Sequence, residues 1–332
     1  VNCAAGVCTA TAADAVLNVK DLRAILQHGP LTIVSGSAAQ DIEIDTSFHW
    51  TQRHHLTLDA FRSILFREAV ISEARGAVTL TTNDGGSGGD YSFTGKGKLA
   101  FWDLRSILIV NGATFTLVND IKTLASDIAA NPSGSYALAR GYDASVDGTY
   151  AATPIPTPFV GTLAGLGHSI ANLSIHRATA KKYVNTAFFD EIAAGGIVRD
   201  FTLDNASIAA DGRYSYIGGL AALNEGAVSH GAFNGSVSST GKGSYTAGLV
   251  GWSTGTVSDS NTSGSITSVS AHGRNTAGLV GRNEGTVTRS SSNATVKDRF
   301  GACGLVGDNY GTVRFSSATG PASISDQLKG EN

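Results

Sequence analysis

The sequence lacks the features that define several common functional classes. Among 332 residues there are no methionines and only 6 prolines, and 15% of the residues are charged. The net charge is −3, and lysine and arginine form no block, so a polybasic surface for nucleic acid or for a membrane is excluded. No apolar run is long enough to cross a bilayer, and the HExxH and CxxC motifs are absent. We therefore expect no nucleic-acid partner, no membrane insertion, no metal site and no cofactor.

Cysteine is also scarce, with three residues in the whole chain. Cys3 and Cys8 are close enough to close a small terminal loop, and we expect a disulfide between them, formed in an oxidising compartment; a pair of reduced thiols is the alternative. Cys303 takes a place where related segments of the chain have glycine or alanine, which predicts a small, packed thiol. The chain begins VNC, with neither an initiator methionine nor a signal peptide, which predicts a mature product or a fragment.

One short phrase recurs four times between residues 217 and 313. The copies read IGGLAALNEGAV, TAGLVGWSTGTV, TAGLVGRNEGTV and ACGLVGDNYGTV. Their leucines, at 220, 249, 279 and 305, lie 29, 30 and 26 residues apart, and each is followed eight residues later by a valine. The first three copies add another apolar residue nine positions further on. A period of this length indicates a solenoid, a propeller or an array.

Each copy therefore supplies three apolar anchors, separated by glycine, serine, threonine and asparagine. No apolar stripe with a helical period connects them, so the segments suit three short strands per coil, joined by turns in which glycine adopts positive φ. When such coils stack, leucine lies over leucine and valine over valine, and the core becomes continuous although no single copy could form one. The repeats predict an all-β fold, a β-solenoid.

The same places can be followed beyond the four copies. The stretch AFFDEIAAGGIV is a degenerate fifth copy, in which Phe188 and Val198 take the leucine and valine places and Ile208 is the third anchor. The asparagines of the phrase share one place and should form a stacked ladder that bonds the backbone of neighbouring coils: Asn224, Asn283 and Asn309. After the last copy, ASISDQLKGEN lacks the phrase, which predicts either a terminal cap or a chain cut from a longer array.

The first half of the chain carries looser signals. Residues 14–29 suit a short helix or an irregular cap, which would protect the first coil from edge pairing. Strands of alternating polarity follow, and residues 120–130 have helical spacing, so we expect a helical or loop insertion near 120–160. The proline cluster TPIPTPF marks either a boundary or a projecting loop. We divide the chain into a cap with a small disulfide loop, a first solenoid section and a continuous repeat section: residues 1–30, 31–150 and 151–332.

The phrase GLVGxNxGTV resembles the GLUG motif of bacterial cell-surface proteins, although the first copy has Ala221-Ala222 in place of Val-Gly. The segment from YALARGYDAS to GTLAGLGHSIANLSI looks like the block that commonly precedes such repeats. LTIVSG, FHWTQRHHLTLDAF and AVTLTTNDGGSGGDYSF are similar to filamentous-haemagglutinin-like adhesins. The resemblance implies a right-handed parallel β-helix that a Gram-negative bacterium exports, located outside the cell or at the outer-membrane surface, and serving adhesion or the extracellular matrix.

A cluster in FHWTQRHH provides candidate ligand contacts: His49, Trp50, Arg53 and His54. An exposed aromatic ring among polar side chains would stack on a sugar ring. The alternative is a surface turn with one packed tryptophan. Adjacent histidines on a strand point to opposite faces, so the spacing does not make a ready zinc site.

Two acidic groups are candidate sites. Asp41, Glu43 and Asp45 alternate with isoleucines, which puts three carboxylates on one outward strand face, within reach of a cation or of a basic partner. The alternative is a solvated face whose like charges resist edge pairing. The densest charged group on the solenoid does not fix a carboxylate pair at a working distance for catalysis: Asp190, Glu191, Arg199, Asp200 and Asp204.

The sequence thus favours a secreted or cell-surface adhesin or matrix protein without a catalytic centre. We expect it to bind a host or matrix surface, with carbohydrate as a candidate ligand, through the lateral solenoid faces and through loops such as Asp84–Gly89 and Thr149–Phe159. The alternatives are a β-helix polysaccharide lyase or hydrolase, and a structural segment of a filament formed by self-association. If the protein recognises a ligand, the residues that contact it should lie outside the repeated positions.

Overall fold

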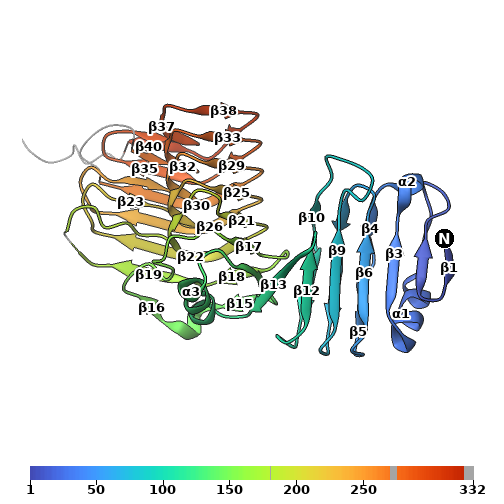
Figure 1. Cartoon of the computed structure of the whole chain (residues 1–332). Coiled ribbons are helices and arrows are strands. Elements are labelled where there is room, and N and C mark those ends of the chain that lie inside the picture. The colour runs from blue at the N-terminus through green and yellow to red at the C-terminus, as the bar shows by residue number, and fades with distance from the viewer. Residues whose placement is uncertain (180, 270–274, 325–332) are drawn as a thin grey trace, which may run out of the picture. The chain divides into compact units, whose positions relative to one another are not determined.

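The computed structural model describes residues 1–179, 181–269 and 275–324. This part of the chain is nearly all β, and its strands stack in parallel as a right-handed β-helix, so the predicted fold class is confirmed (Figure 1). The chain forms two compact units. The first contains residues 1–119, 135–140 and 166–168, and the second contains residues 120–134, 141–165 and 169–332.

The first unit begins with a disulfide-closed hairpin and a helix. Strands β1 (Asn2–Ala4) and β2 (Val7–Thr9) pair antiparallel, and Cys3 and Cys8 are joined by a disulfide. Helix α1 (Val19–His28) is capped by the Asn18 side chain, which accepts a hydrogen bond from the Lys20 amide. Leu22 and Leu26 are buried, so one face of the helix packs on the unit as a cap would.

Three parallel sheets form the walls of the first unit, and each coil contributes one strand to each sheet. The first sheet contains β3 (Leu31–Val34), β6 (His55–Asp59), β9 (Ala77–Thr81) and β12 (Ile107–Val110). The second contains β4 (Ile42–Ile44), β7 (Ile64–Phe66) and β10 (Tyr91–Phe93), and the third contains β5 (Phe48–Trp50), β8 (Ala69–Ser72) and β11 (Lys98–Phe101). Alternate side chains point inward, and Leu31, Leu56, Val78 and Leu108 stack in register inside the first sheet.

The regular coils of this unit end in a hairpin. After β12 the chain reverses through Asn111 and Gly112, both at positive φ, into the antiparallel strand β13 (Ala113–Val118). Strand β14 (Ser135–Leu138) then pairs parallel with β13. The intervening helix α3 (Ile121–Ala130) belongs to the second unit, and Asp120 caps it by accepting a hydrogen bond from the Thr123 amide. The helix predicted at 120–130 is therefore present.

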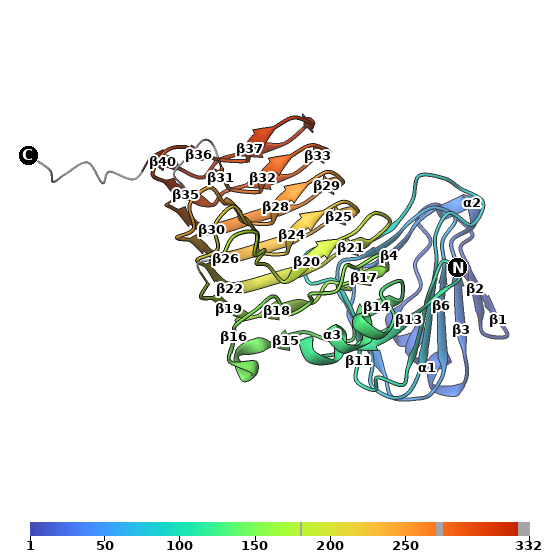
Figure 2. The same ribbon diagram turned by 60° about the vertical axis from the view of Figure 1, so that its left-hand side comes forward.

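The second unit contains the recurring phrase, whose coils stack as Figure 2 shows, and each coil of the phrase contributes strands to four sheets. The phrase itself forms β20 (Phe189–Ile192), β24 (Ala221–Asn224), β28 (Val250–Ser253), β32 (Val280–Asn283) and β37 (Val306–Asn309). Its valine lies in the next sheet, with β17 (Thr162–Ala164), β21 (Ile197–Arg199), β25 (Ala227–Ser229), β29 (Thr256–Ser258), β33 (Thr286–Thr288) and β38 (Thr312–Arg314).

The other two sheets complete each coil. One contains β15 (Tyr142–Asp143), β16 (Thr149–Tyr150), β18 (Ser169–Ala171), β19 (Ser174–Arg177), β22 (Thr202–Ala210), β26 (Ala232–Ser239), β30 (Asn261–Ser268), β34 (Ser291–Ser292), β35 (Thr295–Asp298), β39 (Ser317–Ala318) and β40 (Ala322–Ile324). The fourth is short and precedes the phrase, with β23 (Tyr216–Ile217), β27 (Tyr245–Ala247), β31 (Thr276–Ala277) and β36 (Ala302–Cys303). The apolar anchors define only three sides because the large repeated side chains of this extra strand, Tyr216 and Tyr245, are only half-buried.

The predicted anchors lie in the core. Leu220, Leu249 and Leu279 are at most 1% exposed, and the valines that follow them stack in register. The degenerate fifth copy has its predicted places, because Val198 pairs with Val228 and Ile208 pairs with Val237.

The asparagine ladder is also present, with a serine as one member. Asn224 donates its side-chain N–H to the Ser253 hydroxyl over 3.0 Å, and Asn283 donates to Asn309 over 2.7 Å. Asn224 also donates to the Thr256 carbonyl, which belongs to the neighbouring coil. These side chains therefore join the coils through the interior, as predicted.

Two predictions concern the last coils. Cys303 pairs in register with Ala277, as expected from the repeats, but it is half-buried, because β36 pairs only with β31 among the described strands. Of the terminal stretch ASISDQLKGEN, residues 325–332 lie outside the described residues. No helix in the described ranges is both long and apolar enough to span a membrane.

The stacking makes a specific prediction for stability. Leu279→Ala removes a fully buried anchor and leaves a cavity, so the free energy of unfolding should fall by about 2–5 kcal/mol. Thr256→Ala, at an outward and exposed place on β29, should change it by less than about 0.5 kcal/mol. Urea unfolding followed by circular dichroism measures both. Equal effects of the two substitutions would contradict the stacked core.

Candidate functional site

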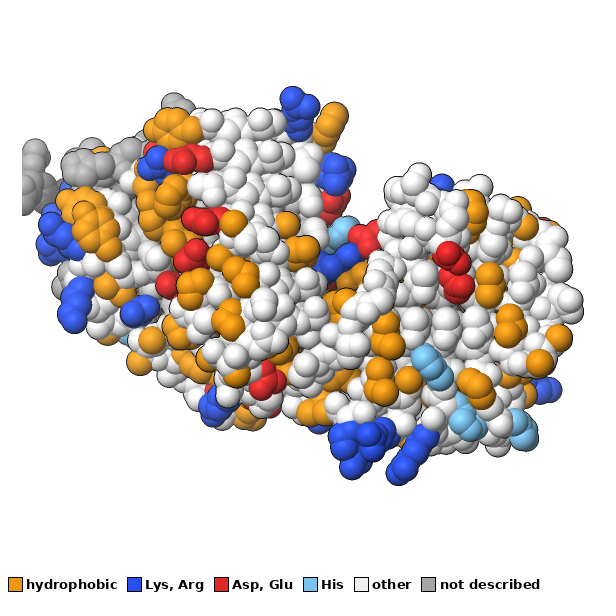
Figure 3. Space-filling model, in the orientation of Figure 1, with side chains coloured by type: hydrophobic (Ala, Val, Ile, Leu, Met, Phe, Trp, Pro, Cys, Tyr) orange, Lys and Arg blue, Asp and Glu red, His pale blue; other side chains and the backbone are white. Residues whose placement is uncertain are grey.

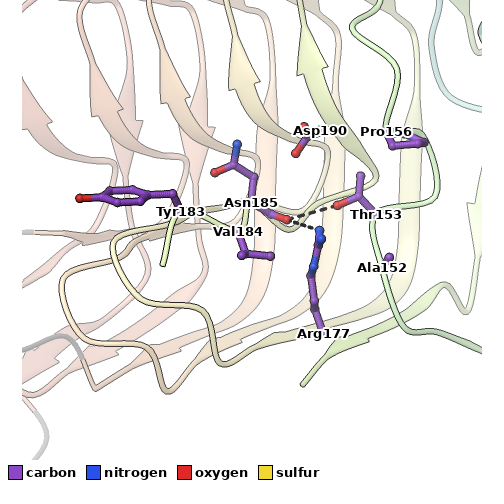
Figure 4. A pocket seen from close by; sticks show the side chains of 8 residues that line it. All are labelled: Ala152, Thr153, Pro156, Arg177, Tyr183, Val184, Asn185 and Asp190. Atoms are coloured by element: carbon purple, nitrogen blue, oxygen red, sulfur yellow. Dashed lines mark hydrogen bonds between the residues drawn. The ribbon is translucent and has the colours of Figure 1, made fainter. Parts of the chain in front are cut away.

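A cavity of about 220 Å³ opens on the second unit. Four stretches of the chain line it, as Figure 4 shows: the proline-rich segment, the end of β19, a loop before β20, and β20 itself. The residues that line it are Ala152, Thr153, Pro156, Arg177, Tyr183, Val184, Asn185 and Asp190. Three of them come from Thr149–Phe159, one of the segments in which the sequence places binding.

The proline-rich segment is part of a coil of the second unit. Ile155 forms an isolated parallel bridge with Phe189, and Phe159 forms one with Ile192. Both Ile155 and Phe159 are fully buried. The segment therefore runs beneath β20 in place of a regular strand, and it brings Pro156 to the cavity.

Asp190 stands where the recurring phrase otherwise requires a small residue. Strand β20 pairs Phe189 with Ala221 and Glu191 with Leu223, so Asp190 takes the place of Ala222 and, one coil further, of Gly251. A Cβ atom on Gly251 would lie 2.8 Å from the Ile217 amide nitrogen, because the fourth strand passes close by. The loop that faces β20 leaves room for a carboxylate, and the cavity lies beside it. The departure of AFFDEI from the phrase was the sequence signal for this site.

Asn185 organises the wall opposite Asp190. Its backbone carbonyl accepts hydrogen bonds from Arg177 Nη1 over 2.8 Å and from the Thr153 hydroxyl over 3.4 Å, the two bonds drawn in Figure 4. Its side-chain Oδ1 accepts a hydrogen bond from the Tyr216 amide over 3.2 Å. The side-chain nitrogen is thereby left to donate toward Asp190.

One carboxylate, that of Asp190, and one guanidinium, that of Arg177, line the cavity. Burial raises the pKa of Asp190, while the positive charge of Arg177 and a hydrogen bond from Asn185 oppose that rise. Burial also raises the pKa of Glu191, and the negative charges of Glu225 and Asp190 add to the rise. Arg177 and Asp190 both line the cavity, and the charge of Arg177 acts on Asp190, but the structure shows no direct ion pair between them in the described part of the chain.

Beside this cavity the outward side chains of successive coils form a cluster that we name the aromatic corner, and its members are Tyr216, Tyr245, Trp252, Arg282 and Tyr310. Tyr216 lies 5.7 Å from Tyr245 and 5.1 Å from Trp252 between ring centroids. The Arg282 guanidinium lies over the rings of Tyr245, Trp252 and Tyr310 at 5.3–5.9 Å.

Acidic side chains border the aromatic corner. The Tyr245 hydroxyl donates to Asp308 over 3.0 Å, and Arg282 Nε donates to Glu284 over 2.7 Å. Arg282 is 31% exposed and Tyr310 is 72% exposed, so the corner is open to solvent at its last coil. Figure 3 shows hydrophobic side chains beside acidic and basic ones over this part of the second unit.

Trp252, Arg282 and Asp308 form one column of the corner. They occupy the single variable position between the small residue and the asparagine place of the phrase, and the β28–β32 and β32–β37 pairings align them. The repeated residues around them point inward or bond the next coil. This variable position supplies Trp252 and Arg282 to the aromatic corner, while Tyr216 and Tyr245 come from the fourth strand and Tyr310 follows the asparagine place.

The four candidate ligand contacts predicted in FHWTQRHH do not all line one cavity. Trp50 is only 3% exposed, so it offers little ring face to a ligand. His49 Nδ1 lies 2.5 Å from Glu73, and His54 Nδ1 lies 2.6 Å from the Leu26 carbonyl at the end of α1. Arg53 is exposed. His49 and Trp50 do line a cavity of about 560 Å³ between α1 and β5, but His54 and Arg53 are not among its lining residues.

Other acidic candidates are engaged by neighbouring side chains. Arg62 bonds Asp41 through Nε over 2.9 Å, and Arg67 lies 2.9 Å from Glu43 and 3.2 Å from Asp45. The alternating carboxylates therefore face arginines of the next coil. In the described residues no group of histidine, cysteine, aspartate or glutamate has the arrangement to hold a metal ion.

The charged group from 190 to 204 is divided among different places. Arg199 bonds Asp200, which is 7% exposed, over 2.7 Å. Asp204 accepts a hydrogen bond from Asn234 over 2.9 Å. Only Asp190 faces the cavity. The sequence identified the acidic group but missed Arg177, Asn185 and the aromatic corner.

No family model matches the chain, and neither the curated proteins nor the solved structures contain a significant match to it. Amide, guanidinium and carboxylate groups in the cavity can bind and orient a polar ligand, and the aromatic corner can stack against one.

The Asp190 environment can be tested by titration. Asn185→Ala removes a hydrogen bond to the ionised form, so the pKa of Asp190 should rise further above the ordinary aspartate range. Carbon NMR of the carboxyl groups across a pH series measures this shift, and Asp14, which is exposed, serves as the internal control. A lower or unchanged Asp190 pKa in the variant would contradict the assignment.

The same group should affect stability in a defined direction. Because the folded-state pKa is raised, the folded protein binds this proton more tightly than the unfolded chain does. The stabilising contribution is complete below the unfolded pKa and is lost as the pH rises through the folded pKa. Asp190→Asn should remove this stabilisation at acidic pH, as measured by thermal unfolding at pH values that span the titration of carboxyl groups. An unchanged pH profile would contradict it.

Proposed function

We propose that this chain is a secreted or cell-surface binding protein, an adhesin or a component of an extracellular matrix, that contacts carbohydrate without catalysing its cleavage. The observation that carries the proposal is the aromatic corner on the lateral face of the second unit. The resemblance of the phrase to GLUG-motif surface proteins supports the same class.

The aromatic corner has the physical properties that carbohydrate recognition needs. Sugar rings present an apolar face and a polar rim, and tyrosine and tryptophan pair an apolar ring with a polar edge. Arg282 and Asp308 are placed beside the rings to donate to and accept from hydroxyl groups. Because strands of neighbouring coils lie about 4.8 Å apart, successive side chains repeat at short and regular intervals along the surface.

A second candidate is a polysaccharide lyase or hydrolase, and Asp190 is the observation that favours it. Asp190 is a half-buried carboxylic acid with a raised pKa near an arginine, which is a common arrangement for acid–base catalysis. A hydrolase would also need a second carboxylate across the scissile bond. In the described residues the cavity is lined by one carboxylate only, so we favour binding over cleavage.

Two assays run on the same protein test these alternatives. We expect the intact chain to bind a subset of a glycan array and to release no reducing sugar from the polysaccharides that it binds. Reducing-sugar release would overturn the proposal in favour of an enzyme. Failure to bind any glycan would also overturn it and would favour a structural role in a filament.

Substitution at the exposed end of the aromatic corner sharpens the test. Tyr310→Ala should weaken glycan binding about threefold to tenfold, because one ring contact is worth roughly 0.5–1.5 kcal/mol. Phe315→Ala is the matched control, since Phe315 is an 86% exposed aromatic residue outside the corner. Biolayer interferometry on an array-selected glycan measures both, and equal losses would contradict a role for the corner.

A further inference from the structure

We propose that the cavity at Asp190 is a specificity subsite for one amino-sugar unit of a polysaccharide whose neighbouring units lie along the aromatic corner. This inference rests on the proposed carbohydrate binding and names its ligand class. The two features then have separate roles: the cavity selects the sugar unit, and the aromatic corner binds the rest of the polysaccharide.

The size and lining of the cavity favour a single sugar unit. Its volume of about 220 Å³ is below the roughly 300–1,000 Å³ typical of sites for drug-sized ligands. One part of the lining is polar, with Arg177, Asn185 and Asp190, and another part is apolar, with Ala152 and Pro156. A sugar ring has the same division between a hydroxylated edge and an apolar face.

The charge distribution favours a unit that carries an amine. The carboxylates of Asp190, Glu191 and Glu225 lie near one another: burial is the largest cause that raises the pKa of Glu191, and the negative charges of Glu225 and Asp190 add to the rise. The single cation that lines the cavity, Arg177, already donates Nη1 to the Asn185 carbonyl. An ammonium group near Asp190 would offset the cost of burying its charge, whereas an acidic sugar would add a fourth negative charge.

One wall of the cavity contacts the aromatic corner. The Tyr216 amide donates to the Asn185 side chain, and the Tyr216 ring then contacts Tyr245 and Trp252 on the following coil. Each coil advances about 4.8 Å along the solenoid, close to the advance of one sugar residue in an extended polysaccharide. A polysaccharide with one sugar unit in the cavity therefore contacts one new set of protein side chains per coil.

The test uses calorimetry on the full chain with three probes: a glucosamine hexamer, its fully N-acetylated counterpart, and a galacturonic acid hexamer. At about pH 6, ordinary carboxyl groups are ionised and the sugar amines carry positive charge. We expect the glucosamine hexamer to bind most tightly and the galacturonic acid hexamer to bind most weakly.

Two variants separate charge from shape. Asp190→Asn should weaken binding of the glucosamine hexamer about tenfold or more and affect the N-acetylated hexamer much less, because only the amine loses its charged partner. Ala152→Phe should fill the cavity from an exposed position and weaken binding of both. Asp14→Asn, which removes the same charge from an exposed residue of the first unit, is the control.

The outcomes distinguish the subsite from the proposed function. If the wild-type chain binds glycans but Asp190→Asn and Ala152→Phe leave the glucosamine affinity unchanged, the subsite is wrong and carbohydrate binding stands. Tighter binding of the galacturonic acid hexamer would overturn the amino-sugar assignment. If the wild-type chain binds none of the array glycans and none of the three probes, both proposals fail.

Discussion

The structure of the second unit depends on coils that stack in register at the spacing of parallel strands. This stacking places identical residues above one another, so leucines and valines share a continuous core and asparagine side chains bond from coil to coil. It also brings the short fourth strand against the phrase. At that contact the backbone leaves space for a small residue only, and a Cβ on Gly251 would approach the Ile217 nitrogen to 2.8 Å.

The candidate site follows from the same constraint. Where the fourth strand comes this close to the phrase, the phrase requires alanine or glycine, and no space is left between the two strands. In the coil of β20 the facing chain is a loop, Asp190 replaces the small residue, and a cavity lies beside it. The candidate site therefore lies in the coil where a loop replaces the close fourth strand. The neighbouring variable position holds Trp252 and Arg282. Its side chains point outward, so they can contact a ligand without affecting the packing of the core.

Binding and catalysis make different demands on these residues. Binding along a polymer needs weak contacts repeated at regular intervals, and the register of the solenoid provides them. Cleavage needs two groups at a fixed separation about one bond. The carboxylates near the cavity have raised pKa values chiefly because they are buried. A raised carboxyl pKa suits both the selection of a cationic ligand and proton transfer. Probes that differ only in charge therefore distinguish the two roles better than activity assays alone.

The sequence by itself determined the solenoid, its three anchors, the fifth copy and the asparagine ladder, because residues 26–30 positions apart become neighbours by stacking and a regular period reports that contact directly. Helix α3 was also predictable, since its apolar spacing and its cap are local. Only the tertiary structure decided that Trp50 is buried, that Arg177 and Asn185 meet Asp190, and that Tyr216, Trp252 and Tyr310 share one corner. These contacts join different strands of a coil through loops of irregular length, and no sequence period specifies how such loops fold.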